Sequence, residues 1–340
     1  MDQTRADDIE VFTGNEDQYD VAVVGGGAAG LSAALMLGRA LRRVIVIDAG
    51  APRNAPAEHM HAFLGHDGLP PSELLEKGRA EIQSYGVEVV QDSVISIQQR
   101  ESHSHGKSFT LSLDNVAPVS ARRLLIATGA RDALPDIPGL AEVWGRDVHI
   151  CPYCHGYEVR NTPLGVIATG EHSVPYALMI RNWTPDLVFF EDQRGPSSAE
   201  EIEQLDAMEI RRVPGKISRL VLEDNRLAGV ELETGEIIDR SAIFLGSQLA
   251  PDLSFARDLG LAMKETPQGT VIEVDPQGRT SVPGVWAAGN VANPSLQVVG
   301  AAAAGNMAGG AINMDLIMED VGRRVADAQT SRSSVVNAAP

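Results

Sequence analysis

Two cysteines, Cys151 and Cys154, are the residues of this chain best suited to chemistry. They are the only cysteines among 340 residues and stand two residues apart in the run HICPYCHGYEVR. A pair at this spacing can close a disulfide across one turn of chain, and such motifs commonly lower the pKa of one thiol toward neutrality. Because the thiolate is the reactive form, the pattern indicates thiol–disulfide redox chemistry.

Other interpretations of the pair stay open at this point. A structural disulfide would restrict the unfolded chain little, because the loop that it closes is so short. A zinc site would need further ligands, and the neighbouring His149 and His155 are the ones at hand. Two inert thiols could also stand together by chance. We favour the redox interpretation and predict no metal site.

His155 directly follows the second cysteine. An imidazole titrates near neutrality, so this side chain is suited to take a proton from a dithiol or return one. The alternative is a histidine that only caps the turn. We predict that Cys151, Cys154 and His155 form the catalytic group.

A glycine-rich turn near the N-terminus predicts a dinucleotide cofactor. Residues 21–24 form a short apolar strand, residues 31–39 have helical spacing, and residues 44–47 form a second strand that ends at Asp48. The G-x-G-x-x-G turn between the first strand and the helix consists of Gly25, Gly27, Ala28, Ala29 and Gly30. Such glycines allow a tight turn, a close approach to pyrophosphate and close helix packing, while the carboxylate binds ribose. A merely compact turn is the alternative.

The rest of the chain repeats this layout and supplies further elements. After the cysteines, residues 164–168, 175–181 and 187–190 form a second strand–helix–strand unit. Antiparallel strands are expected at 109–113 and 122–126, at 217–222, 229–233 and 236–238, and a helix rich in small residues follows Pro294. Two strand–helix–strand units predict an α/β protein with two nucleotide folds.

Composition limits the function classes. A net charge of −18 argues against nucleic acid and anionic membrane as partners, because both are polyanions. The first 18 residues are acidic and lack the apolar centre of a signal peptide, and no apolar run is long enough to span a bilayer. We expect a cytoplasmic enzyme, in which a CxxC is catalytic rather than structural.

Together these motifs resemble the low-molecular-weight thioredoxin reductases, which are flavoproteins with two Rossmann-like, three-layer dinucleotide-binding domains. The matching features are G-x-G-x-x-G with Asp48, ATG at 127–129, the CxxC in the second unit, and VWAAGN near the C-terminus. The resemblance covers residues 19–325 and implies FAD as cofactor and a homodimer. It implies an FAD-binding domain made of 19–131 and 247–325, an inserted NAD(P)-like domain at 132–246, and flexible tails at 1–18 and 326–340.

The resemblance also implies roles for single residues. Cys154 faces the flavin and Cys151 exchanges with the substrate. Val94 contacts adenine, Arg53, Asn54 and His61 are neighbours of flavin or substrate, and the dipole of the last helix stabilises reduced flavin. His61, in an HMH run, could also belong to an ordinary polar loop. The remaining expected FAD contacts are Ala127, Thr128, Gly129, Gly289, Asn290, Gln297 and Val298.

Three departures from the family pattern affect these expectations. His155 replaces the usual Asp, and Asn290 replaces an acidic residue but can still bind a ribityl hydroxyl or phosphate. The GGGxSA turn of NADPH-dependent members reads ATGEHS at 168–173 here. The next strand ends at Glu191 and Asp192, where those members carry arginines. These carboxylates are expected to repel a 2′-phosphate, although NADH is not excluded.

A dithiol flavoprotein with a poor NADPH site needs another electron partner. The CPYCHG motif resembles the dithiol oxidases related to thioredoxin reductase that close disulfides in holomycin- and gliotoxin-type natural products. Electrons would pass from a small-molecule dithiol to Cys151–Cys154, then to FAD and O2, with release of H2O2. The alternatives are a reductase of thioredoxin-like proteins that uses NADH, NADPH or ferredoxin, and a non-enzymatic redox sensor.

Overall fold

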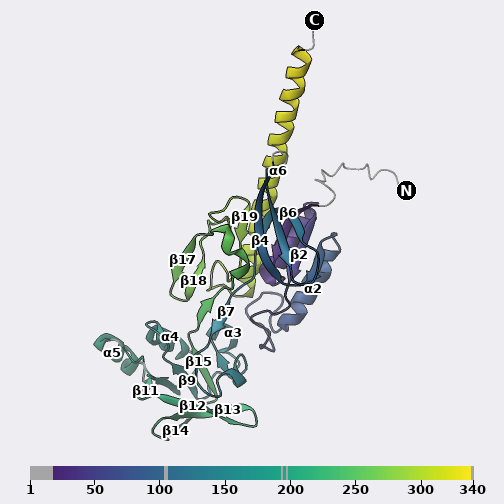
Figure 1. Cartoon of the computed structure of the whole chain (residues 1–340). Helices are drawn as coiled ribbons and strands as arrows, with labels where there is room; N and C mark the ends of the chain where they lie inside the picture. The colour runs from purple at the N-terminus through teal and green to yellow at the C-terminus, as the bar shows by residue number, and fades with distance from the viewer. Residues whose placement is uncertain (1–17, 103–105, 193, 197, 338–340) are drawn as a thin grey trace.

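The computed structural model describes residues 18–102, 106–192, 194–196 and 198–337. Figure 1 shows two groups of elements, one built around a mixed sheet and the other around a parallel sheet, joined through short strands. The α/β class expected from the sequence is confirmed. The expected N-terminal tail lies outside the described residues, apart from residue 18.

The first sheet holds the G-x-G-x-x-G unit at its centre. Its strands are β1 (Tyr19–Val24), β2 (Val44–Asp48), β3 (Glu88–Gln91), β4 (Val94–Ser102), β5 (Gly106–Leu113), β6 (Val119–Ile126) and β19 (Val285–Ala287). Their order is β3-β2-β1-β6-β5-β4, and β19 pairs with β6. β1 runs parallel to β2 and β6, and β6 runs parallel to β19. The carboxyl ends of these four strands therefore meet at one edge.

Alternation along β1 determines the two faces of this sheet. Val21 and Val23 are fully buried against α1 (Ala28–Arg39), α2 (Pro71–Gln83) and α6 (Val298–Asn337). Ala22 and Val24 pack on the other face, in the core that also contains Phe109 of the antiparallel strands. Because successive side chains of a strand point to opposite faces, a continuous apolar run fits a strand that is covered on both sides.

The second sheet carries the cysteine segment at its margin. Its strands are β8 (Val148–His149), β9 (Leu164–Ile167), β10 (Leu187–Phe190), β11 (Arg211–Val213) and β15 (Ala242–Leu245), all parallel, in the order β11-β10-β9-β15-β8. Its helices are α3 (Pro152–His155), α4 (Ser173–Ile180) and α5 (Ala199–Ala207). An antiparallel meander of β12 (Ile217–Glu223), β13 (Arg226–Leu232) and β14 (Ile237–Asp239) accompanies it.

Two short strands connect the groups. β7 (Arg131–Ala133) pairs antiparallel with β16 (Gln248–Ala250), near the domain boundaries expected from the sequence. Beyond β16 lie the hairpin of β17 (Met263–Thr266) and β18 (Gly269–Ile272) and the 3-10 turn η2 (Ser254–Leu259); a second such turn, η1 (Ala141–Val143), precedes β8. The boundaries themselves remain our proposal.

The last helix is longer than the sequence suggested. The expected flexible tail from residue 326 is instead helical as far as Asn337, and α6 projects beyond the first sheet in Figure 1. The run ADAQTSRSS is polar, which suggested a flexible tail, but it contains no Gly or Pro that would end a helix. No helix among the described residues combines the length and apolar content needed to cross a bilayer.

Candidate active site

The predicted FAD-binding residues gather at the common strand edge of the first sheet. Gly25 follows β1, Asp48 ends β2, Ala127 follows β6, and Gly289 comes shortly after β19. Thr128 and Gly129 continue the turn after β6, while Val94 begins β4 just after β3 ends. A crevice outside the carboxyl ends of parallel strands is where α/β sheets bind dinucleotides.

Backbone conformation and close contacts require glycine at two positions of the first turn. Gly25 has a φ of +107°, and a Cβ on it would lie 2.5 Å from the carbonyl oxygen of Ala127. A Cβ on Gly30 would lie 1.9 Å from the carbonyl oxygen of Gly25. Gly27, in contrast, faces open space, with nothing within 4 Å of such a Cβ. The turn is therefore packed on its protein side and open on the side where a pyrophosphate would approach, so these residues fit FAD.

Asp48 lies beside this turn with its carboxylate half-buried. Its Oδ1 accepts a hydrogen bond from the N–H of Gly50 at 3.3 Å, and a Cβ on Gly26 would stand 2.6 Å from its Oδ2. The nearest cation is Arg79, whose Nη1 is 3.9 Å from Oδ2. A carboxylate held at this place is suited to accept hydrogen bonds from ribose hydroxyls.

The two cysteines are joined in a disulfide at the start of a single helical turn. The Sγ atoms are 2.12 Å apart, and Cys151 precedes α3, whose first residue is Pro152. Proline suits the first helical position because its missing N–H would have no partner there. The N–H of Cys154 donates to the carbonyl oxygen of Cys151 at 3.1 Å, which closes the turn. This turn thus brings the two sulfurs together.

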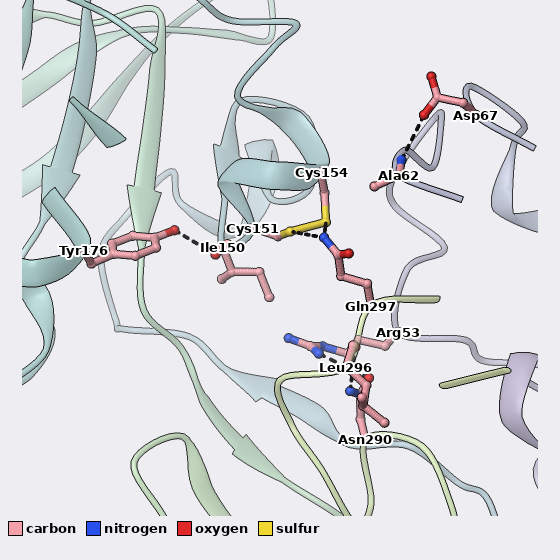
Figure 2. Close-up of a disulfide and its surroundings, with 10 residues drawn as sticks. All are labelled: Arg53, Ala62, Asp67, Ile150, Cys151, Cys154, Tyr176, Asn290, Leu296 and Gln297. Atoms are coloured by element: carbon pink, nitrogen blue, oxygen red, sulfur yellow. Dashed lines mark hydrogen bonds between the residues drawn. A yellow bond between two sulfur atoms is a disulfide. The ribbon is translucent and has the colours of Figure 1, made fainter. Parts of the chain in front are cut away.

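Gln297 lies across this disulfide (Figure 2). Its Nε2 is 3.5 Å from the Sγ of Cys151 and 3.5 Å from the Sγ of Cys154. Gln297 directly precedes Val298, the first residue of α6, so the start of this helix faces the sulfurs. The sequence predicted Gln297 and Val298 as flavin neighbours, and the contact of Gln297 with both sulfurs was not anticipated.

Asn290 supports the segment that carries Gln297. Its Nδ2 donates to the carbonyl oxygens of Asn293, Pro294 and Leu296, at 3.2, 3.3 and 3.0 Å. Its Oδ1 accepts from the Nη1 of Arg53 at 3.5 Å. The Asn290 amide is therefore engaged by main chain, whereas the sequence suggested a role in holding FAD directly.

Arg53 belongs to the long loop after β2 and forms an ion pair with a linking strand. Its Nε and Nη2 lie 2.7 and 2.6 Å from the two carboxylate oxygens of Asp132, in β7. The hydroxyl of Ser247 donates to the same carboxylate at 2.6 Å. This group connects the loop of the first sheet to both connecting strands, because Ser247 directly precedes β16.

His155 is stacked on a second histidine. The rings of His149 and His155 are 4.4 Å apart between centroids and are nearly parallel, at 13°. His149 is 4% exposed, and burial lowers its pKa to about 3. Burial also lowers the pKa of His155, with Glu158 opposing the shift and His61 adding to it. Both ring nitrogens of His149 and the Nδ1 of His155 have no hydrogen-bond partner within the described chain.

The remaining predicted loop residues are His61 and Asn54. The Nδ1 of His61 is 3.4 Å from Asp67, and its Nε2 is 3.5 Å from Glu158, which follows the cysteine turn. The carbonyl oxygen of Asn54 accepts from the N–H of Ala57 at 3.1 Å, in a turn of the same loop. His61 thus connects the long loop to the cysteine segment.

No group of three or more His, Cys, Asp or Glu among the described residues is arranged to hold a metal.

The glycine-poor turn of the second sheet is closed by its own groups. The hydroxyl of Ser173 accepts from the N–H of Thr169 at 3.0 Å and from the N–H of Gly170 at 3.1 Å. The N–H of Ser173 donates to the carbonyl oxygen of Gly170 at 3.1 Å, and Pro175 has no N–H to offer. A phosphate binds at such a turn through free backbone N–H groups, and Ser173 occupies those of Thr169 and Gly170.

The carboxylates at the end of β10 are not free, which corrects one part of the sequence argument. The Oε1 of Glu191 is 3.2 Å from the Nη1 of Arg212, and Asp192 accepts from the N–H of Ile217 at 2.9 Å. A cavity of about 260 Å³ lies at the turn itself, lined by Gly170, Glu171, Ser173, Val174, Arg194, Gly195 and Glu201. Repulsion of a 2′-phosphate is therefore weaker than expected, and the hydrogen bonds of Ser173 are what distinguishes this turn.

Comparison with known proteins identifies the family. A model of the pyridine nucleotide-disulphide oxidoreductases matches residues 19–306. The chain belongs to this family. It is 30% identical to the thioredoxin reductase sirT of Leptosphaeria maculans, over 90% of this chain and 97% of that protein. It is 31% identical to the thioredoxin reductase tcpT of Claviceps purpurea, over 90% and 96%.

The solved structures agree with this assignment. The crystal structure of HlmI has a TM-score of 0.87 to this chain at 43% identity, and the match covers 94% of this chain and 99% of HlmI. The protein is thus a thioredoxin reductase-like oxidoreductase, and FAD is its cofactor, as the sequence predicted. In this flavoprotein, the glycine turn and Asp48 are the residues suited to hold the cofactor.

Sequence reasoning overlooked two features of the site. The signal for Ser173 was present, because serine stands where the family motif has alanine, but its hydroxyl was not considered as an acceptor. For His149 the sequence suggested only a role as zinc ligand. Its stacking on His155 depends on how β8 approaches α3. A contact between elements of this kind has no periodicity that a sequence could show.

Proposed function

We propose that this flavoprotein oxidises a small-molecule dithiol to its intramolecular disulfide and transfers the electrons to O2. The observation that carries the proposal is the closed turn of the second sheet, where Ser173 occupies two N–H groups that a nicotinamide nucleotide would need. The cysteine disulfide meanwhile lies against Gln297 at the start of α6, next to the FAD-binding edge. In this proposal the two occupied N–H groups weaken the binding of a nicotinamide donor, and the redox centre receives its electrons from the thiol side.

The chemistry at sulfur requires two exchange steps. A substrate thiolate attacks the Sγ of Cys151, the Cys151–Cys154 bond breaks, and Cys154 leaves as a thiolate. The second substrate thiolate attacks the sulfur now bound to Cys151, which releases the product disulfide and the Cys151 thiolate. Two electrons have then moved from substrate to the cysteine pair, and the two protons of the substrate thiols have gone to His155 and to solvent. Bound FAD supplies the two-electron chemistry that restores the protein disulfide, with O2 reduced to H2O2.

We propose that His155 accepts a proton from the substrate dithiol. Its pKa lies below the ordinary value of 6.5 because the ring is buried. The imidazole is therefore neutral at pH 7 and has an accepting nitrogen. Glu158 and His61, 3.5 Å apart, both act electrostatically on the ring and offer a route by which the proton can leave. We infer that His155 is the base and that its stack with His149 fixes the ring.

The substrate class and the assembly are further parts of the proposal. The CPYCHG motif supports a natural-product dithiol of the holomycin and gliotoxin type, which has two thiols that can bridge within one molecule. Formation of a ring disulfide needs a single thiol-reactive cysteine and no protein docking surface. A homodimer is proposed from the family resemblance.

The test is an anaerobic spectral titration of the purified yellow protein. We expect excess dithiothreitol, as a probe dithiol, to bleach the flavin absorbance, while NADPH and NADH at the same excess leave it unchanged. Admission of air should restore the colour and produce one H2O2 for each dithiol oxidised. Cys154→Ser is the control, because it retains the cofactor site but breaks the electron path.

Two outcomes would contradict the proposal. Rapid bleaching by either nicotinamide would show that Ser173 does not close the turn, and the protein would then be a disulfide reductase. Oxidation of dithiol at the wild-type rate by Cys154→Ser would show that the electrons bypass the cysteine pair.

A further inference from the structure

One carboxamide touches both sulfur atoms of the redox pair. The Nε2 of Gln297 is at 3.5 Å from each Sγ, and a carboxamide nitrogen carries two N–H donors. Because the two sulfurs are 2.12 Å apart, they lie in nearly the same direction from this nitrogen, and one N–H can serve either of them. Gln297 also stands at the N-terminus of α6, where the helix dipole adds partial positive charge.

This contact strengthens when the disulfide opens. The sulfurs of a disulfide are neutral and weak acceptors, whereas a thiolate accepts a charge-assisted hydrogen bond about twice as strong as a neutral one. An interaction that is stronger in the reacting state than in the resting state accelerates the reaction. The same preference stabilises the reduced pair and so makes the disulfide a stronger oxidant.

The position of Gln297 depends on Asn290. The Asn290 Nδ2 donates to the three carbonyl oxygens of the segment that leads into Gln297, and the last of them belongs to the adjacent Leu296. The Oδ1 faces the guanidinium of Arg53, which agrees with this orientation of the amide. An aspartate accepts but does not donate, so at this position it would place negative charge against three carbonyl oxygens.

We propose that Gln297 is a catalytic residue of thiol–disulfide exchange, and that Asn290 is the positioning residue that holds it across the sulfurs. When a substrate thiolate attacks Cys151, the electron pair of the broken S–S bond goes to Cys154, and an N–H of Gln297 stabilises the charge there. The same amide serves Cys151 when that sulfur leaves in turn. The inference rests on the cysteine pair as the reacting centre of the proposed function, and it requires neither O2 nor a particular dithiol.

The experiment measures the cysteine pair directly in the FAD-containing protein under anaerobic conditions. One readout is the rate of iodoacetamide alkylation of the fully reduced pair from pH 5 to 9. The other is the equilibrium of the pair with a dithiothreitol redox buffer at pH 7, scored by mass spectrometry. The variants are Gln297→Leu, Gln297→Glu and Asn290→Asp, and the last restores the acidic residue of the family motif.

Loss of the amide donor should destabilise the thiolates. We expect Gln297→Leu to slow alkylation at pH 6 about threefold, because the smaller thiolate fraction is partly offset by higher nucleophilicity. The equilibrium should move about tenfold toward the disulfide, equivalent to about 30 mV. Gln297→Glu should exceed both effects through repulsion, and Asn290→Asp should change both in the same direction. The FAD content should remain at the wild-type level in Asn290→Asp.

Matched controls are available on the surface of the second sheet. Gln204→Leu and Asn182→Asp make the same chemical changes at exposed positions, and both should leave the two readouts unchanged. Wild-type alkylation and equilibrium in Gln297→Leu and Gln297→Glu would overturn the role of Gln297. Wild-type values in Asn290→Asp alone would overturn its positioning role. If nicotinamide bleaches the flavin, the proposed function fails, and these readouts still decide the inference.

Discussion

At the scale of the residue, the site depends on polar groups that are buried without partners. His149 has neither ring nitrogen paired within the described chain and is 4% exposed. A buried polar group without a hydrogen bond costs on the order of 1–3 kcal/mol of stability. We infer that this cost is offset by the support that the His149 ring gives to His155. The centroids of the two rings are 4.4 Å apart.

The burial of His149 predicts a dependence of stability on pH. Above the unfolded value of 6.5 the ring is neutral in both states and has no effect. Below it the unfolded chain binds the proton first, because burial holds the folded pKa at about 3. Asp147, Arg226 and His155 are the titratable and charged groups that act on the ring. The free energy of unfolding should therefore fall between about pH 6.5 and 3, with a slope approaching ~1.4 kcal/mol per pH unit from this group.

Urea unfolding at pH 7 and pH 5 measures this effect. His149→Phe keeps an aromatic ring for the stack and removes the titrating group, so its loss of stability between the two pH values should be smaller than that of wild type. An exposed histidine gives the control, and His66→Phe should retain the wild-type difference. Equal losses in wild type and His149→Phe would show that His149 is protonated in the folded protein.

At the scale of the element, the contact between α1 and α6 connects the FAD turn to the Gln297 helix. A Cβ on Gly305 would lie 1.9 Å from the carbonyl oxygen of Ala29, and one on Gly309 would lie 2.9 Å from that of Ala33. The two backbones approach so closely that only glycine fits at the crossing. Ala29 belongs to the glycine-rich turn unit, so a shift of either helix would move the cofactor site relative to the sulfurs.

Gly305→Ala tests this contact. We expect it to lower stability by about 1–3 kcal/mol through overpacking and to reduce the FAD bound per chain. Gly310→Ala is the matched control, because it lies on the open side of the same helix with nothing within 4 Å of its Cβ. That variant should gain about 1 kcal/mol from helix propensity. Melting temperature and the ratio of flavin to protein absorbance give both results, and equal behaviour of the two variants would contradict the close crossing.

Much of this arrangement could be predicted from the sequence, because the local signals agree with the fold. The run of residues 21–24 with its glycine turn and Asp48 predicted β1, α1 and β2, and the small residues after Pro294 predicted a closely packed helix. The end of α6, the Asn290 contacts and the stack of His149 on His155 could not be predicted. Each depends on contacts between distant segments, and these are set by packing rather than by local propensity.

At the scale of the whole molecule, α6 has two different faces. Arg122 and Arg123 of β6 are buried and form ion pairs with Glu319 and Asp315, which hold one face of the helix against the first sheet. The other face exposes apolar side chains at three-, four- and seven-residue intervals, namely Met307, Met314, Met318, Val321 and Val325. Such spacing forms a continuous apolar seam along a helix. We propose that a second copy of this chain covers it.

Light scattering after size-exclusion chromatography tests the dimer. One chain has a mass of 36.2 kDa, and we expect about twice this value for the wild type. Met314→Glu with Met318→Glu should place charge in the seam and lower the mass toward that of one chain, while FAD content is maintained. Asp327→Lys, on the same helix but outside the seam, is the control for a change of charge. A wild-type mass of one chain would contradict the dimer.

The hydroxyl of Ser173 has a consequence for the cell in which the protein works. If its bonds to Thr169 and Gly170 exclude nicotinamide, the supply of metabolic reductant no longer governs turnover. Under the proposed function, the rate would follow oxygen tension and the arrival of substrate instead. Low NADPH would then leave turnover unchanged, whereas low oxygen would let the unoxidised dithiol accumulate.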